Sequence, residues 1–310
     1  MRKCFSWMVT NILFIGMLTI TGCHFPQTVI EPTPTAVSQT ITPWQPTHSK
    51  VTMTPTSTAT LTYTPSTTPN PPNPTSSQTP TPTWVYNEPG QVIAPILLYH
   101  HVNGENTDSR YRVSIPDFRA QMQTLYEEGY TTITISMLVE ALTKGRDLPP
   151  KPVVITFDDG HQSVYENAFP IMSEFGFVGV FYIVANRIYD IDDFVNITDL
   201  KTMIAAGWEI GSHGYTHSDI TQNHGSAAYE IAQSKHDLER AIGSDVNTFA
   251  YPFGTFDTFV GQKVSNYGYL AGMGLGKSTT HTLGNLFYLN RIEIHGDTSL
   301  DEFYNKIHLE

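Results

Sequence analysis

The chain has 310 residues, a formal net charge of −12 at neutral pH and only two cysteines, Cys4 and Cys23. Duplex nucleic acid is bound mainly by Lys and Arg that neutralise phosphates, so this charge argues against a nucleic-acid partner. Both cysteines precede any globular sequence. The globular part therefore has no disulfide, thiolate metal site or cysteine nucleophile available to it.

The first 22 residues have the features of a targeting segment. Arg2 and Lys3 supply a positive start, and the apolar stretch 7–20 that follows is too short for a comfortable membrane span. The stretch closes with a Gly-Cys pair at Cys23, which resembles the lipobox of bacterial lipoproteins. We expect a signal peptide over residues 1–22 and a lipid anchor on Cys23. The alternative is an ordinary signal peptide or an uncleaved anchor.

Residues 23–86 are expected to form a disordered linker. Thr, Pro and Ser dominate this segment, charges are rare, and no apolar periodicity is present. Such a composition cannot bury enough surface to offset chain entropy, and its prolines favour extended conformations. The linker is interpreted as a tether that holds the following domain away from the membrane, although a tolerated low-complexity segment would have the same composition.

Residues 87–310 have the composition of one folded domain. Apolar, β-rich runs alternate with amphipathic stretches of helical period, which predicts a parallel sheet, either open and doubly wound or closed into a barrel. The runs are 96–102, 131–135, 153–157, 178–185, 208–212, 248–252, 269–273 and 289–294, and the helix candidates include 116–128, 162–175, 227–242 and 256–266. Eight strands favour a distorted (β/α) barrel, in which chemistry gathers at the carboxyl ends of the strands.

Two adjacent carboxylates, Asp158 and Asp159, follow the strand predicted at 153–157 in the segment Thr-Phe-Asp-Asp-Gly. Paired carboxylates repel one another and lose solvation at such a position, so they usually bind a cation or exchange a proton. A helix N-cap is the alternative role, but one aspartate would satisfy a cap.

Two histidines, His213 and His217, follow the strand predicted at 208–212. Imidazoles four residues apart can converge on one ion, and a set of two histidines and one carboxylate leaves coordination positions open for water and substrate. The spacing alone is weak evidence for a metal. It is stronger beside an Asp-Asp-Gly turn.

Three further strand ends carry polar or aromatic groups. His100 follows the run that begins at residue 96 and suits proton donation to a leaving amine, although a buried core histidine is the alternative. Phe253 lies in an aromatic Tyr-Pro-Phe-Gly turn, which could contact a sugar or be only a barrel corner. Near the C-terminus, Arg291 is a candidate partner for a catalytic carboxylate, and His295 is a rival acid.

These clusters together resemble the polysaccharide deacetylase family with its NodB-homology domain, over essentially all of the chain after the linker and with the core motifs in residues 151–310. The Asp-Asp-Gly segment matches the family's first motif, which implies Asp158 as general base and Asp159 as metal ligand. The family's second motif, His-Ser/Thr-x-x-His, implies His213 and His217 as metal ligands. Gly214 departs from the Ser/Thr of that motif, which puts a supporting hydrogen bond in doubt.

The third motif departs further, because Ala250 occupies the place where the family carries an arginine. The Leu-Leu-Tyr-His-His-Val segment around His100 is similar to the subgroup that deacetylates the exopolysaccharide poly-N-acetylglucosamine. That similarity implies His100 as general acid, with Arg291 in place of the missing arginine. His295 is the second choice for the acid.

The resemblance implies a metal-dependent hydrolase that removes N-acetyl groups from an N-acetylglucosamine polysaccharide such as exopolysaccharide, peptidoglycan or a chitin-like polymer. Zinc is the expected ion, with cobalt, nickel or iron as alternatives, and the Phe253 backbone N–H is expected to stabilise the oxyanion. Two alternatives remain: an O-acetyl esterase acting on xylan or peptidoglycan, and an inactive carbohydrate-binding lipoprotein. The expected location is extracytoplasmic, lipid-anchored to a bacterial membrane or secreted, and no protein partner is inferred.

Overall fold

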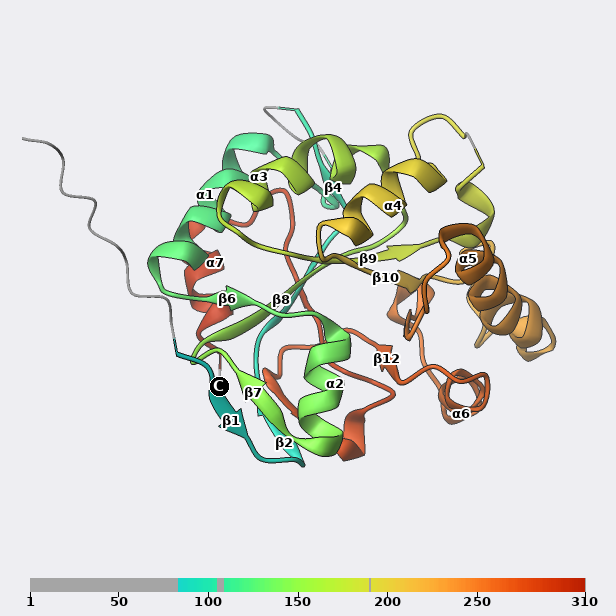
Figure 1. Ribbon diagram of the computed structural model, residues 1–310. Coiled ribbons are helices and arrows are strands. Elements are labelled where there is room, and N and C mark those ends of the chain that lie inside the picture. The colour runs from blue at the N-terminus through green and yellow to red at the C-terminus, as the bar shows by residue number, and fades with distance from the viewer. Residues whose placement is uncertain (1–82, 105–108, 190, 310) are drawn as a thin grey trace, which may run out of the picture. The chain divides into compact units, whose positions relative to one another are not determined.

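The computed structural model describes residues 83–104, 109–189 and 191–309 (Figure 1). The predicted signal peptide, the anchor on Cys23 and nearly all of the predicted linker lie outside these ranges. The first strand, β1 (Val85–Asn87), pairs antiparallel with β7 (Arg146–Leu148). The regular structure of the domain therefore begins just ahead of the boundary expected at residue 87.

A parallel sheet forms the centre of the domain. Its strand order is β12-β11-β10-β9-β8-β3-β14, and β6 pairs with β8. The strands of this sheet are β3 (Ile96–Tyr99), β6 (Thr131–Thr132), β8 (Pro152–Phe157), β9 (Val180–Ile183), β10 (Glu209–Ser212), β11 (Thr248–Ala250), β12 (Ala271–Met273) and β14 (Ile292–Glu293). Each of the eight predicted apolar runs contributes one of these strands.

The sheet curls until its two ends are joined. Residues 289–291 exchange backbone hydrogen bonds of 2.8 to 3.0 Å with Gly272, Gly274 and Gly276 at the β12 end. The residues that follow form β14, which pairs in parallel with β3 at the other end. The predicted distorted (β/α) barrel is thus confirmed, with its seam closed by this segment.

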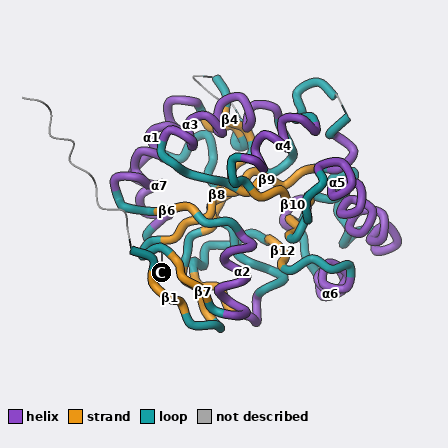
Figure 2. Tube along the Cα trace, in the orientation of Figure 1, coloured by secondary structure: helices purple, strands orange, loops and turns teal. Residues whose placement is uncertain are grey.

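Helices cover the outside of the curled sheet. In Figure 1, α1, α3 and α4 lie above strands β8 to β10, and Figure 2 shows the alternation of helix and strand along the trace. The helices are α1 (Ile115–Glu127), α2 (Ile135–Lys144), α3 (Phe169–Glu174), α4 (Ile197–Ala205), α5 (Ser234–Ile242), α6 (Thr258–Asn266) and α7 (Leu300–Ile307). Two of the predicted helices begin with a π-helical turn, at Val164–Ala168 before α3 and at Ala228–Gln233 before α5.

The remaining strands form short pairs at the margins of the barrel. They are β2 (Gln91–Ile93) with β13 (Thr280–Thr282), and β4 (His101–Val102) with β5 (Arg112–Val113). In the described ranges no helix combines the length and apolar character that crossing a membrane requires.

The alternation of side chains along β8 sets the direction of the catalytic candidates. Ile155 and Phe157 belong to the core shared with the helices, whereas Val154 packs in the second cluster with residues of β9, β11 and β12. Successive side chains of a strand point to opposite faces, so Asp158 continues the series of Val154 and Thr156. The fold thereby directs the carboxylate of Asp158 toward the mouth of the barrel.

Burial of His281 makes the stability of the fold sensitive to acid. The side chain is fully buried on β13, its Nε2 lies 3.0 Å from the Ala94 carbonyl oxygen, and desolvation lowers its pKa to about 4. As pH falls, the unfolded chain takes up this proton near pH 6.5, before the folded chain does. The free energy of unfolding should therefore fall between about pH 6.5 and pH 4, by about 3 kcal/mol from this group.

The variant His281→Gln keeps a side-chain N–H for the Ala94 carbonyl and has no proton to gain in this range. Urea unfolding at a series of pH values should give a shallower pH dependence for the variant than for the parent chain. Equal slopes in the two proteins would show that His281 does not titrate as described.

Candidate active site

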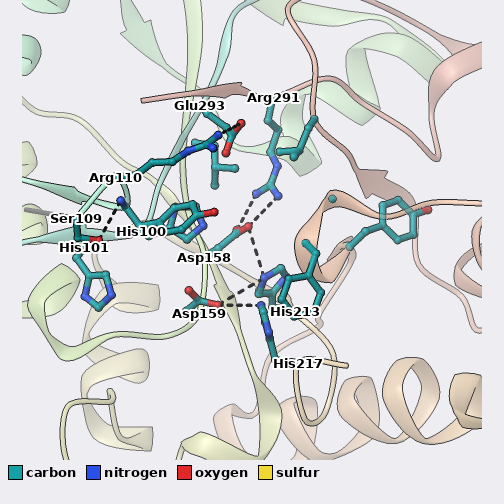
Figure 3. Close-up of a pocket in the computed structure, with 16 residues that line it drawn as sticks. His100, His101, Ser109, Arg110, Asp158, Asp159, His213, His217, Arg291 and Glu293 are labelled. Atoms are coloured by element: carbon teal, nitrogen blue, oxygen red, sulfur yellow. Dashed lines mark hydrogen bonds and ion pairs between the residues drawn. The ribbon is translucent and has the colours of Figure 1, made fainter. Parts of the chain in front are cut away.

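A cavity of about 400 Å³ opens at the carboxyl ends of the barrel strands (Figure 3). Apart from the second-choice acid His295, its lining includes every residue that the sequence predicted for the site: His100, Asp158, Asp159, His213, His217, Phe253 and Arg291. These side chains come from five separate segments of the chain. They meet because parallel strands present their carboxyl ends at the same edge of the sheet.

Three of these residues adopt a left-handed backbone conformation although none is glycine. The φ angles are 75° at Asp159, 66° at His217 and 60° at Phe253. Such conformations cost of order 1–3 kcal/mol each and persist only where the surrounding structure imposes them. Three such residues around one cavity indicate a functional site, and this indication does not depend on the residue types.

Asp159, His213 and His217 form a group that could hold a metal ion, since one ligand atom from each lies within 4.8 Å of the other two. Oδ1 of Asp159 is 3.2 Å from Nε2 of His217 and 3.7 Å from Nε2 of His213. This oxygen is buried and has no hydrogen-bond partner within the described ranges. A buried carboxylate oxygen facing two imidazole nitrogens fits a divalent cation well.

Backbone contacts hold His213 in the orientation that a ligand needs. Its Nδ1 lies 2.9 Å from the carbonyl oxygen of Ala250, to which it donates in the tautomer that leaves Nε2 free to face Asp159. Burial lowers the pKa of His213, and the carboxylates of Asp158 and Asp159 only partly oppose this effect. A neutral imidazole is the form that ligates a metal.

Asp158 is held by a buried guanidinium. Arg291 donates from Nη1 and Nη2 to the two carboxylate oxygens at 2.7 and 2.8 Å, and its Nε donates to the Gly274 carbonyl at 3.2 Å. Both side chains are at most 3% exposed. Burial alone would raise the pKa of Asp158, but Arg291 and His213 outweigh it and hold that pKa below its ordinary value. The carboxylate therefore stays ionised.

The loop that carries both histidines is organised by Glu230, which the sequence analysis missed. Its buried carboxylate accepts hydrogen bonds from the backbone N–H groups of Tyr215 and Thr216, both at 2.9 Å, and from the Thr216 hydroxyl at 2.5 Å. A Cβ at Gly214 would lie 3.1 Å from the same carboxylate. Glu230, from the π-helical turn before α5, therefore fixes the loop between His213 and His217.

The two candidate acids have different surroundings. His100 lines the cavity, with its ring centroid 4.8 Å from that of Tyr111. His295 is not among the lining residues; its Nε2 accepts a 3.1 Å hydrogen bond from Arg110. Burial lowers the pKa of His100, while Asp158 and Asp159 act in the opposite direction.

Arg110 lines the cavity, and the sequence did not indicate it. Its Nη2 lies 3.2 Å from an oxygen of Glu293, at the rim of the cavity opposite the histidine loop (Figure 3). An arginine in a polar surface loop carries no local pattern that would distinguish it from a solvated charge. The place of Arg110 at the cavity is evident only from the tertiary structure, in which β14 lies beside this loop.

Taken together, a buried ionised carboxylate beside a three-residue metal-ligand set is typical of hydrolases that use a metal-activated water. Comparison with known proteins shows which family the site resembles. Residues 145–272 match the family model described as polysaccharide deacetylase. The carboxylate pair, the histidine pair and the Tyr-Pro-Phe-Gly turn all fall within that range.

Relatives agree over more of the chain. A Bacillus subtilis (strain 168) protein whose name assigns it to the polysaccharide deacetylases is 26% identical over 204 residues, which are 64% of this chain and 71% of that protein. A poly-β-1,6-N-acetyl-D-glucosamine N-deacetylase of Staphylococcus aureus (strain MRSA252) is 24% identical over 201 residues, covering 60% and 69% of the two chains. The crystal structure of a Bacillus cereus polysaccharide deacetylase superposes with a TM-score of 0.62 at 26% identity, covering 70% and 69% of the two chains. Residues 145–272 thus match a polysaccharide deacetylase domain, and the relatives that are similar over more of the chain support a deacetylase hydrolase.

The ligand set predicts binding of one divalent ion per chain. In protein stripped with chelator and titrated with Zn²⁺ or Co²⁺, we expect His213→Ala to weaken binding at least a hundredfold, because a three-residue set loses one ligand. His281→Gln, which alters a buried histidine outside the cavity, is the matched control and should bind as the parent does. Unchanged affinity in His213→Ala, measured by calorimetry, would rule out this set.

Proposed function

We propose that the protein removes N-acetyl groups from a polymer that contains N-acetylglucosamine. The observation that carries the proposal is the ionised Asp158 carboxylate lying beside the group formed by Asp159, His213 and His217. The name of the Staphylococcus aureus relative, a poly-β-1,6-N-acetyl-D-glucosamine N-deacetylase, supports an amino-sugar polymer as the substrate.

The attack on the acetyl group requires a base and a stabilised oxyanion. A divalent ion held by Asp159, His213 and His217, zinc in our proposal, would polarise the acetyl carbonyl and lower the pKa of a water molecule. Asp158 accepts the proton of the attacking water, since Arg291 keeps this carboxylate ionised and fixes its direction. The backbone N–H of Phe253, at the exposed turn beside His217, donates to the oxyanion that develops on the acetyl oxygen.

Collapse of the tetrahedral species breaks the carbon–nitrogen bond and requires a proton for the amine. His100 supplies it, because its imidazole lines the cavity whereas His295 is engaged by Arg110 at the rim. The products are acetate and a free glucosamine unit. One water is consumed and no redox partner is needed.

We also propose that the enzyme works outside the cytoplasm, held to the membrane by a lipid on Cys23. The sequence of residues 1–86 is the support for this location: an apolar leader that ends in a Gly-Cys pair, followed by a Thr/Pro-rich tether. Globomycin-sensitive processing and metabolic labelling with a fatty acid, lost in Cys23→Ser, would test it.

Acetate release tests the proposed reaction. We expect release from poly-N-acetylglucosamine, chitin oligomers or peptidoglycan, loss of release with chelator, and recovery when a divalent ion is added. Asp158→Asn should keep the metal yet lose at least a hundredfold in kcat, because the amide cannot accept the proton. Release from acetylated xylan alone would replace the proposal with an O-acetyl esterase, and metal-free protein without turnover would indicate a binding protein.

The assignment of the acid is tested by comparing His100→Ala with His295→Ala. Loss of a positioned proton donor costs about a hundredfold or more, so His100→Ala should lose that much in kcat while His295→Ala changes it by less than tenfold. A pH–rate profile adds a second readout, since only the variant that lacks the acid should lose its alkaline limb. The reverse order of losses would move the role to His295.

A further inference from the structure

Arg291, which holds the proposed base Asp158, is one of the largest fully buried side chains in the described part of the chain. Its hydrogen bonds fix two sides of the guanidinium. Nη1 and Nη2 donate to Asp158, and Nε donates to the Gly274 carbonyl (Figure 3). The direction of the base therefore also depends on what packs against the rest of Arg291.

The guanidinium of Arg291 lies over the ring of Tyr182. Its Cζ is 5.4 Å from the ring centroid, within the range of a cation–π interaction. Tyr182 is fully buried on β9 and is not among the residues that line the reaction cavity. A buried aromatic face attracts a guanidinium more strongly than an exposed one. Tyr182 thus contacts Arg291 from inside the barrel, where it does not reach the substrate.

A glycine on the neighbouring strand makes room for this ring. Tyr182 pairs in register with Gly211 of β10, and a Cβ built on Gly211 would lie 2.3 Å from the Tyr182 ring. Any side chain at this position would have to move the ring. The ring can therefore extend over β10 as far as Thr248 on β11, whose Oγ1 accepts a 3.2 Å hydrogen bond from the Tyr182 hydroxyl.

The hydrogen bond at Thr248 continues into a network that ends on a helix. The Thr248 hydroxyl donates to Oε1 of Glu209 at 3.0 Å, and Oε2 of Glu209 accepts from the Ser136 backbone N–H in the first turn of α2 at 2.8 Å. Burial is the main cause that raises the pKa of Tyr182, so its phenol stays neutral and can donate. The network thereby ties the ring of Tyr182 to β10, β11 and α2.

We propose that Tyr182 is a positioning residue for the reaction, because its ring holds Arg291 and so fixes the direction of the Asp158 carboxylate. The inference rests on the proposed function, in which Asp158 accepts the proton of the attacking water. Misplacing a reacting group by about 1 Å can cost about a hundredfold in rate, so a residue that never touches the substrate can set the rate. The ring supplies the positioning, and the hydroxyl with its network orients the ring.

Acetate release by two variants of Tyr182 tests this role. Tyr182→Leu removes the ring, and its kcat should fall about thirtyfold while KM stays within about twofold of the parent value, because the base is displaced and the substrate contacts remain. Tyr182→Phe keeps the ring and should restore kcat to within about fivefold of the parent. Equal losses of kcat in the two variants would assign the effect to the hydroxyl and overturn the proposal.

Tyr269→Leu is the matched control. It truncates another buried tyrosine, whose hydroxyl donates to the Ile231 carbonyl at 3.0 Å and which does not line the cavity. Its kcat should stay within about threefold of the parent value, since a general loss of packing does not move the base. The same fall of kcat in Tyr269→Leu and Tyr182→Leu would overturn the positioning role.

Nitrogen-15 NMR of the arginine side chains reads the contact without any turnover. The Nε–H signal of Arg291, assigned by its loss in Arg291→Lys, should carry a ring-current shift that is kept in Tyr182→Phe and lost in Tyr182→Leu. Gly211→Ala displaces the ring without removing it, so it should change this shift and lower kcat about tenfold. An Nε–H signal at one position in all these variants would overturn the proposal.

The failure of this inference differs from the failure of the proposed function. A parent chain that releases no acetate from any acetylated amino-sugar polymer would refute the deacetylase. Release by the parent with an unchanged kcat in Tyr182→Leu would refute the positioning role alone.

Discussion

Two adjacent carboxylates at the end of a buried strand would repel one another strongly, and the structure offsets this by surrounding them with donors. Both oxygens of Asp158 accept from the guanidinium of Arg291, and Asp159 faces His217. Nε2 of His213 lies close to both carboxylates, 3.6 Å from Asp158 and 3.7 Å from Asp159. Asp158 is thereby kept ionised, and one buried oxygen of Asp159, without a hydrogen-bond partner in the described ranges, is directed at the candidate ion site.

The segment that closes the barrel also supplies the positive charge of the site. Residues 289–291 bridge β12 and β14, and this segment delivers Arg291 to the interior of the barrel mouth. Ala250 occupies the position where an arginine was expected, and its backbone carbonyl oxygen lies 2.9 Å from Nδ1 of His213. The guanidinium beside Asp158 comes from Arg291, in the segment just before β14.

The histidine loop is held by a residue from another segment of the chain. The Glu230 carboxylate accepts from two backbone N–H groups and a hydroxyl of this loop. Ligands that must converge on one ion need their own orientation fixed, because a displacement of a fraction of an ångström weakens binding.

The sequence by itself determined the eight strands, the barrel and seven of the residues that line the reaction cavity. Apolar runs and the Asp-Asp-Gly and His-x-x-x-His segments are local patterns, and parallel strands bring their carboxyl ends together in any such barrel. The sequence could not indicate Glu230 or Arg110, since their roles depend on contacts between segments far apart in the chain. The sequence also could not compare the surroundings of His100 and His295. Which of them faces the cavity depends on the closure of the barrel, because hydrogen bonding between strands sets where each side chain points.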